Sequence, residues 1–345
     1  MMQIELGKIF STRNLFKTIL LFTFCTNAVA AEWQTQSEMP TPRQEIYADV
    51  ANGVVYVAGG ILNDIVTTSA AFEAFNAKQN SWSKLSPLPV PRHHITPTVI
   101  AGKVYAMGGF DGPYPEWAMK SDMFIYDIDS DSWQQGKPLP EAVGEHVALA
   151  VNGKVHVIGG RVRPAYAANH FDAYVDSTVH YIYDPQKQEW TKGKAALTAR
   201  NSAAAAVIDG LIYVVGGRHN VVQKDGTQLQ QNLSNLEVYN PINDEWKTLA
   251  PLPESLGGNA AASVKGKLHV FGGEQWAPEK KVFPSAWIYD PVKDEWQKTV
   301  DMITARHGLA AAAVGDVIYT IGGCTVVGGG ATVGTTEALL LKSKK

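Results

Sequence analysis

Residues 210–217 read GLIYVVGG, and residues 237–246 read EVYNPINDEW. The first stretch is a run of β-branched and aromatic residues that begins at a turn glycine and ends at a glycine pair. The second stretch holds another such run, an Asn-Pro turn and a return run that ends at a tryptophan. These patterns predict short antiparallel strands joined by tight turns.

The same pattern recurs along the whole chain. Paired glycines lie at positions 59/60, 108/109, 159/160, 216/217, 272/273 and 322/323. Tryptophans lie at positions 33, 82, 133, 190, 246 and 296, each 26 residues before the first glycine of the next pair (33 to 59, 82 to 108, 133 to 159, 190 to 216, 246 to 272, 296 to 322). A repeat of about fifty residues with four strands per unit is typical of propeller blades.

The glycine pair, the Tyr-Asp-Pro turn and the tryptophan resemble the Kelch repeat, and the resemblance covers essentially all of the chain after residue 30. It implies an all-β, six-bladed Kelch β-propeller with strands counted outward from a central channel. The repeats begin with a Trp strand, AEWQTQ, and end with TEALLLKS, a blade without its Trp strand. We therefore expect the N-terminal strand to complete the sixth blade.

Residues 1–30 have the pattern of a cleaved secretory signal peptide. Three basic residues precede the apolar run TILLFTFC, and small residues follow it at Ala28 and Ala30. The apolar run is too short to span a bilayer. We therefore expect a periplasmic or secreted product, with the propeller at residues 31–345 and no transmembrane segment after cleavage; an uncleaved anchor is the alternative.

Charge and cysteine content limit the possible partners and cofactors. The formal net charge of −3 gives no indication of a nucleic-acid partner. Cys25 belongs to the predicted signal peptide, so Cys324 is left without a disulfide partner and we expect it to be a buried, inert thiol. Because no histidine, cysteine or carboxylate spacing of known type occurs, we expect no metal and no other cofactor.

The starts of the six inner strands align sixteen residues before each glycine pair. They read RQEI from Arg43, RHHI from Arg92, VGEH from Val143, RNSA from Arg200, LGGN from Leu256 and RHGL from Arg306. Since successive strands run in opposite directions, these starts share one face with the loops that follow the glycine pairs. All of the length variation falls in those loops, so we expect the binding site on this face.

Two interpretations of the aligned arginines are open. They could bind a ligand, or they could tie one blade to its neighbour, because Kelch repeats often carry a structural arginine here. The next positions differ from blade to blade, which favours a binding role for some of them. The predicted ligand-binding residues are Arg43, Glu45, Arg92, His94, His146, Arg161, Arg200, Asn201, Arg218, His219, Asn259 and Arg306.

Arginine, histidine and glutamate around one pocket suit an anionic, hydroxylated small molecule such as a sugar acid. The chain resembles the secreted bacterial Kelch proteins, which include N-acetylneuraminate epimerase, and this implies an isomerisation of the mutarotase or epimerase type by acid–base groups. The predicted catalytic candidates are Glu274, Glu145, His93 and His307. The catalytic glutamate of that family follows a glycine in a middle blade, where this chain has Arg218; only Glu274 directly follows a glycine pair here.

The sequence leaves two other classes of function as alternatives. The first is a non-catalytic propeller that binds a protein or polysaccharide partner through the same face. The second is a copper oxidase similar to galactose oxidase, which the sequence disfavours because the repeats number six rather than seven and no Tyr-His set accompanies Cys324.

Overall fold

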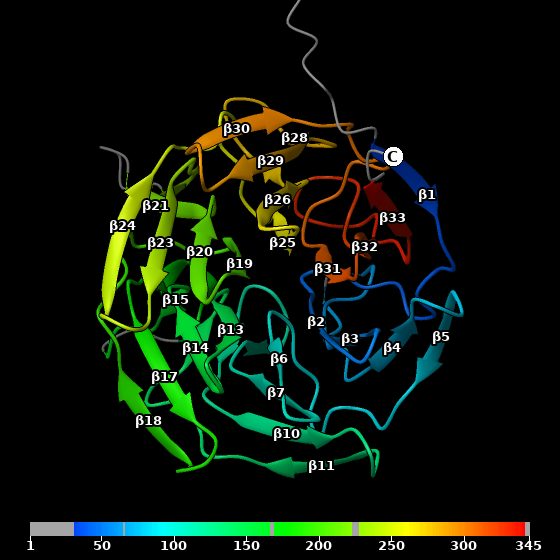
Figure 1. Cartoon of the computed structure of the whole chain (residues 1–345). Helices are drawn as coiled ribbons and strands as arrows, with labels where there is room; N and C mark the ends of the chain where they lie inside the picture. The colour runs from blue at the N-terminus through cyan, green and yellow to red at the C-terminus, as the bar shows by residue number, and fades with distance from the viewer. Residues whose placement is uncertain (1–30, 65, 166–168, 223–227, 342–345) are drawn as a thin grey trace, which may run out of the picture.

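The computed structural model describes residues 31–64, 66–165, 169–222 and 228–341. Within these ranges the chain forms six four-stranded antiparallel sheets, which surround one axis as blades (Figure 1). The predicted signal peptide, residues 1–30, lies outside the described residues. The described part of the chain has no helix of the length and hydropathy needed to cross a membrane.

The blades follow one another along the chain. From the inner to the outer strand, blade 1 consists of β2 (Tyr47–Ala51), β3 (Val54–Ala58), β4 (Phe72–Asn76) and β5 (Ser81–Lys84). Blade 2 consists of β6 (Thr96–Ile100), β7 (Lys103–Met107), β10 (Met123–Asp127) and β11 (Ser132–Gln135). Blade 3 consists of β13 (Val147–Val151), β14 (Lys154–Ile158), β17 (His180–Asp184) and β18 (Glu189–Lys192).

The second half of the ring repeats this plan. Blade 4 consists of β19 (Ala204–Ile208), β20 (Leu211–Val215), β23 (Leu236–Asn240) and β24 (Glu245–Leu249). Blade 5 consists of β25 (Ala260–Val264), β26 (Lys267–Phe271), β29 (Ala286–Asp290) and β30 (Glu295–Lys298). Blade 6 consists of β31 (Ala310–Val314), β32 (Val317–Ile321), β33 (Thr336–Leu341) and β1 (Ala31–Thr35).

Short strands extend the loops that follow the glycine pairs. They are β8 (Phe110–Asp111), β9 (Ala118–Met119), β15 (Arg161–Val162), β16 (Val175–Asp176), β21 (Arg218–Val222), β22 (Gln228–Asn232), β27 (Glu274–Gln275) and β28 (Lys281–Val282). A further short strand, β12 (Val143–Gly144), precedes the inner strand of blade 3 and pairs with β15. A single turn of 3-10 helix, η1 (Phe171–Ala173), belongs to the same loop as β15 and β16.

The N-terminal strand closes the ring, as predicted. β1 pairs antiparallel with β33 over its whole length, with Trp33 opposite Leu339. Figure 1 shows the first and last coloured segments of the chain side by side in this blade. The outermost strand of blade 6 therefore comes from the opposite end of the chain, and pairing removes an open sheet edge.

The tryptophan of each repeat bridges two blades. The Trp33 indole Nε1 donates a hydrogen bond of 3.0 Å to the carbonyl of Val300, four residues after Trp296. The other five donate in the same register, from Trp82 to Ser37, from Trp133 to Ser86, from Trp190 to Lys137, from Trp246 to Lys194 and from Trp296 to Ala250. This shared bond accounts for the fixed position of the tryptophan in every repeat.

The glycine pair permits close approach between neighbouring blades. A Cβ on Gly272, whose φ is +62°, would lie 2.3 Å from the carbonyl oxygen of Arg306 in blade 6. The next residue, Gly273, donates its N–H to that same carbonyl at 2.9 Å. A side chain would separate the blades here, so only glycine fits.

The hydrophobic core lies between the blades rather than at one centre. One cluster joins Val215 and Tyr213 of blade 4 to Val270 and Tyr289 of blade 5, and comparable clusters fill the other junctions. The inner strands contact one another in the order β2, β6, β13, β19, β25, β31 and back to β2. They surround a central channel, and the face that bears their first residues is called the mouth face below.

Candidate functional site at the mouth of the channel

A ring of backbone hydrogen bonds defines the mouth of the channel. It is formed by the residues fourteen positions before each glycine pair, Glu45, His94, Glu145, Ser202, Gly258 and Gly308, all of which have a positive φ. Four pairs of neighbours are joined by backbone hydrogen bonds, in which His94 donates to Glu45, Ser202 to Glu145, Gly258 to Ser202 and Gly308 to Gly258. Ile46 donates to Gly308 and closes the ring on that side. The ring holds the side chains of the mouth at fixed positions.

Alternating carboxylates and imidazoles cross this ring. Glu45 occupies the middle, with Oε2 2.9 Å from His94 Nε2 and Oε1 3.6 Å from His307 Nε2. His307 Nε2 also lies 3.4 Å from Glu274 Oε2, and His94 Nε2 lies 3.8 Å from Glu145 Oε1. We call the five side chains Glu274, His307, Glu45, His94 and Glu145 the mouth row. The structure therefore brings together predicted residues from five different blades.

An arginine caps each end of the mouth row. Arg218 donates from NH2 to Glu274 Oε1 at 2.7 Å, and the Nε of Arg161 lies 2.5 Å from Glu145 Oε2. Both guanidinium groups are buried, and Arg161 also stacks over the ring of Phe171 at 4.1 Å. Burial of an ionised carboxylate is tolerated when a partner of this kind neutralises it.

Two glycines make room for the side chain of Arg218. A Cβ on Gly257 would lie 2.4 Å from the Cγ of Arg218, and a Cβ on Gly258 would lie 2.7 Å from its NH2. The LGGN start of the fifth inner strand therefore lacks side chains because Arg218 from blade 4 crosses over it to reach Glu274.

Glu274 receives further donors from two loops. The indole Nε1 of Trp276 donates to its Oε1 at 3.0 Å, and the backbone N–H of Gly328 donates to its Oε2 at 2.8 Å. Trp276, whose exposed fraction is 38%, therefore lies directly beside the buried carboxylate of Glu274. Trp276 is therefore the member of this group that an approaching molecule meets first.

The pKa values in the mouth reflect burial and neighbouring charge. Burial alone raises the pKa of Glu45, but the hydrogen bond and charge of His94, with the charges of His307 and Arg218, lower it to about 2. Burial lowers the pKa of His93 well below its usual range and that of His146 to about 3. Glu45 is therefore an ionised acceptor at neutral pH, whereas His93 and His146 are neutral.

The four aligned arginines have a different environment. Arg43, Arg200 and Arg306 form buried ion pairs with Glu73, Glu237 and Glu337 at 2.8, 2.6 and 2.9 Å, and Arg92 pairs with Asp122 at 2.5 Å. In every case the partner belongs to the third strand of the same blade or to the residues just before it. The side-chain partners of these arginines lie within one blade. The expectation that the side chains tie one blade to its neighbour is therefore wrong. This geometry favours the structural interpretation over ligand binding.

The sequence carried a signal for these pairs. In two of these pairs the glutamate lies two residues before an aromatic residue that is itself seven residues before the tryptophan of the repeat: Glu73 precedes Phe75, and Glu237 precedes Tyr239. Blades 3 and 5 start with Val143 and Leu256 instead of arginine, and they have Tyr181 and Trp287 at the glutamate position.

The other predicted residues lie around the mouth row but outside it. The His93 Nδ1 lies 2.7 Å from the His94 Nδ1, and its ring stacks on Phe110 at 5.4 Å. The His146 Nε2 hydrogen-bonds to the hydroxyl of Thr96.

The remaining three side chains differ in their surroundings. Asn201 donates to Asp176 at 2.7 Å, and the His219 Nε2 lies 3.3 Å from Gln231 on the hairpin of β21 and β22. Asn259 is buried at the channel wall. Cys324 is a buried free thiol whose pKa burial raises.

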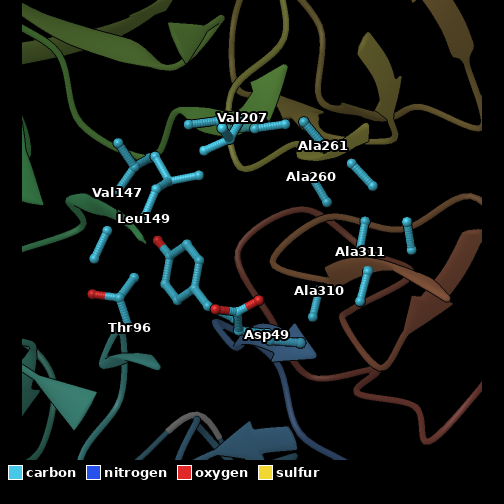
Figure 2. Close-up of a pocket in the computed structure, with 18 of the residues that line it drawn as sticks. Asp49, Thr96, Val147, Leu149, Val207, Ala260, Ala261, Ala310 and Ala311 are labelled. Carbon is cyan, nitrogen blue, oxygen red and sulfur yellow. The ribbon is translucent and has the colours of Figure 1, made fainter. Parts of the chain in front are cut away.

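Sequence reasoning missed the ionisable groups inside the channel. The channel holds a cavity of about 410 Å³, and Asp49 and Tyr47 of β2 are among the residues that line it (Figure 2). The signal in the sequence is that YADVA at 47–51 departs from the runs of small residues, such as AAAA, in the inner strands of other blades. In the described residues no three histidine, cysteine or carboxylate side chains are grouped to hold a metal ion.

Several exposed apolar side chains lie in the loops of the mouth face. They are Val66, Tyr114, Val175, Leu197, Leu229, Trp276, Val300, Ile303 and Val326. The opposite face, which carries the tight turns, has Ile242 and Val292 at its Asn-Pro and Asp-Pro hairpins. Among the described residues, exposed large apolar side chains are thus more numerous on the mouth face than on the opposite face.

Comparisons with known proteins agree with this architecture. Residues 6–273 match the family described as Attractin/LZTR1 beta-propeller, and residues 256–303 match the Kelch motif. Human Kelch repeat and BTB domain-containing protein 12 is 30% identical over 46% of this chain and 26% of its own length. Kelch-like protein 25 from Xenopus laevis is 33% identical over 39% of this chain and 21% of its own length. The chain thus spans about a quarter of the length of these relatives.

A solved structure has the same fold. The structure titled "Structure of YjhT" superposes with a TM-score of 0.73 at 18% sequence identity, over 90% of this chain and 98% of the other. At this level of identity the match concerns the fold alone.

Proposed function

Because the chain belongs to the Attractin/LZTR1 β-propeller family, we propose that it is a binding module that docks a protein partner on its mouth face. Kelch propellers generally bind proteins. The observation that carries this proposal is the gathering of exposed apolar side chains, Tyr114 and Trp276 among them, in the loops of that face. Aromatic side chains of this kind dominate protein interfaces.

The ion pairs and the burial of the mouth row favour a partner that contacts the surface over a ligand that enters a deep pocket. The two arginines that cap the mouth row are each paired with a carboxylate, and Glu274, His307, His94 and Glu145 are buried. A partner therefore meets the loop side chains above the row, while the row fixes the loops from below, as Glu274 does for Trp276 and Gly328.

A pair of matched double variants tests the proposal. The mouth variant changes Tyr114 and Trp276 to serine, and the turn variant changes Ile242 and Val292 to serine. Partners captured from an extract of the source cells by the immobilised protein are identified, and their Kd is measured with purified components. We expect the mouth variant to bind at least tenfold more weakly and the turn variant to bind as the wild type does.

The turn variant is the control for non-specific adhesion to exposed apolar side chains. Ile242 and Val292 have exposed fractions of 88% and 95%, against 51% and 38% for Tyr114 and Trp276. If exposed apolar surface alone retained the partner, the turn variant would suffer more. Loss of binding in the turn variant with retention in the mouth variant contradicts the proposal.

A second candidate function is the binding and isomerisation of an anionic carbohydrate at the mouth. It is favoured by the buried His307, whose Nε2 lies between the carboxylates of Glu45 and Glu274 without a hydrogen bond to either, and by Trp276, whose face can stack on a sugar ring. Such groups could move a proton at an anomeric hydroxyl. The carboxylate partners of Arg161 and Arg218 weigh against an anionic ligand, which would have to displace them.

This second candidate is tested by NMR. Anomeric exchange of N-acetylneuraminate is followed with the wild type, with Glu274→Gln and with Glu279→Gln as an exposed carboxylate control from the same loop. Acceleration by the wild type and the control, lost in Glu274→Gln, supports the enzyme. No acceleration by the wild type contradicts it.

We also propose that the protein is secreted and that residues 1–30 are removed on the way. The supporting observation is the basic, apolar and small-residue pattern of that segment. N-terminal sequencing of the protein from its source cells should find a start near Ala31, whereas a start at Met1 contradicts the proposal.

A further inference from the structure

The wall of the central channel combines many small side chains with polar groups from several blades. The cavity of about 410 Å³ lies beyond the mouth row toward the tight turns, between the inner strands of all six blades. Its described lining consists mostly of alanine and valine, with Asp49 as the one charged side chain among them. Figure 2 shows the Asp49 carboxylate facing the space that Leu149, Val207, Ala261 and Ala311 surround.

Two polar side chains of the wall belong to β2. Tyr47 and Asp49 are two residues apart in this strand, so they project to the same side. At the position of Asp49 the other inner strands have Thr98, Leu149, Ala206, Ala262 and Ala312. At the position of Tyr47 they have Thr96, Val147, Ala204, Ala260 and Ala310. Only blade 1 therefore places a carboxylate inside the channel.

Backbone donors hold the Asp49 carboxylate in place without neutralising it. Its Oδ1 accepts from the N–H of Val50, and its Oδ2 accepts from the N–H of Val99 in blade 2, both at 2.7 Å. Each oxygen of a carboxylate can accept a second hydrogen bond. Among the described residues no cationic side chain forms an ion pair with Asp49. Burial raises its pKa to about 6 despite the two donors.

We propose that the channel is a binding site for a small organic cation, a primary or substituted ammonium on a short aliphatic body. The ammonium donates to the free acceptor positions of Asp49, and the aliphatic part lies against the alanine and valine wall. A charge in such surroundings is stabilised by a cation far more than in water. This inference concerns a different part of the molecule from the mouth face and does not depend on the proposed function.

Size and charge restrict the ligand further. A volume of about 410 Å³ corresponds to roughly fourteen waters at about 30 Å³ each, which is room for a molecule of one ring or a short chain. An anion of the same size would meet the Asp49 carboxylate with no guanidinium or ammonium in the wall to offset it. The site therefore discriminates by the sign of the charge.

Three matched probes test the proposal by isothermal titration calorimetry. They are cyclohexylammonium, the neutral cyclohexanol and the anionic cyclohexanecarboxylate, at one ionic strength and pH 8. We expect cyclohexylammonium to bind at least tenfold more tightly than either of the others. We also expect its binding to weaken as the pH falls below 6, because Asp49 then gains a proton.

Variants locate the binding in the channel. Asp49→Asn removes the charge and should weaken binding at least tenfold, and Ala261→Leu should weaken it by filling the cavity while the carboxylate remains. Asp316→Asn, which removes an exposed carboxylate from a turn, should bind as the wild type does.

Several results would overturn the inference. They are no binding of cyclohexylammonium to the folded wild type, equal binding of the alcohol, or unchanged binding by a folded Asp49→Asn. If Asp49 only joins blade 1 to blade 2 through Val99, its replacement changes the melting temperature while no probe binds. Because Ala261→Leu leaves that junction intact, it decides the question even if Asp49→Asn fails to fold.

Discussion

Replacement of Trp33 tests whether the N-terminal strand closes the ring. Trp33 is 9% exposed, packs edge-on against Phe271 at 5.6 Å between ring centroids, and donates to the carbonyl of Val300. Truncation of a core tryptophan to alanine costs about 3–5 kcal/mol. Trp33→Phe keeps an aromatic ring and loses chiefly the hydrogen bond, so we expect a cost of about 1 kcal/mol.

Urea unfolding followed by far-UV circular dichroism measures both variants. The control is Ile242→Ala, an exposed side chain on the tight-turn face, which should change the free energy of unfolding by less than about 0.5 kcal/mol. The reasoning is refuted if Trp33→Ala costs less than about 1 kcal/mol, since a closing strand cannot lose its buried anchor so cheaply.

Two further predictions concern buried charge. Arg306→Met leaves Glu337 buried without its guanidinium partner, so chemical denaturation should show that the free energy of unfolding falls by about 3–5 kcal/mol. A double variant that also carries Glu337→Gln should recover most of this loss, and no recovery would contradict the ion-pair account. Burial lowers the pKa of His146 to about 3 and those of His156 and His269 to about 4. The unfolded chain binds protons on these groups below about pH 6.5, so stability should fall by about 2 kcal/mol per histidine between pH 7 and pH 5, and equal stability at both pH values would refute this.

The repeat pattern predicted the fold because the same residues make the contacts between blades. The tryptophan donates to the preceding blade and the second glycine donates to the following one, so their spacing is fixed by the size of one blade. The N-terminal strand could be placed for the same reason, since Trp33 has the register of the other five.

The site was harder to predict because alignment does not reveal where a long side chain points. The aligned repeats place both Arg306 and Arg218 at the mouth. Arg306 points into its own blade toward Glu337, whereas Arg218 crosses Gly257 to reach Glu274. The mouth row depends on such crossings between blades. Asp49 escaped notice because a single carboxylate in a strand has no spacing that marks it.

Photo-cross-linking most directly tests the claim that the mouth face is the binding surface. A photoreactive phenylalanine analogue replaces Trp276 on the mouth face in one protein and Val292 on the tight-turn face in another, and each is irradiated with the partner recovered from the source cells. We predict a cross-linked complex from position 276 and none from position 292. A complex from position 292 alone would contradict the assignment of the binding face.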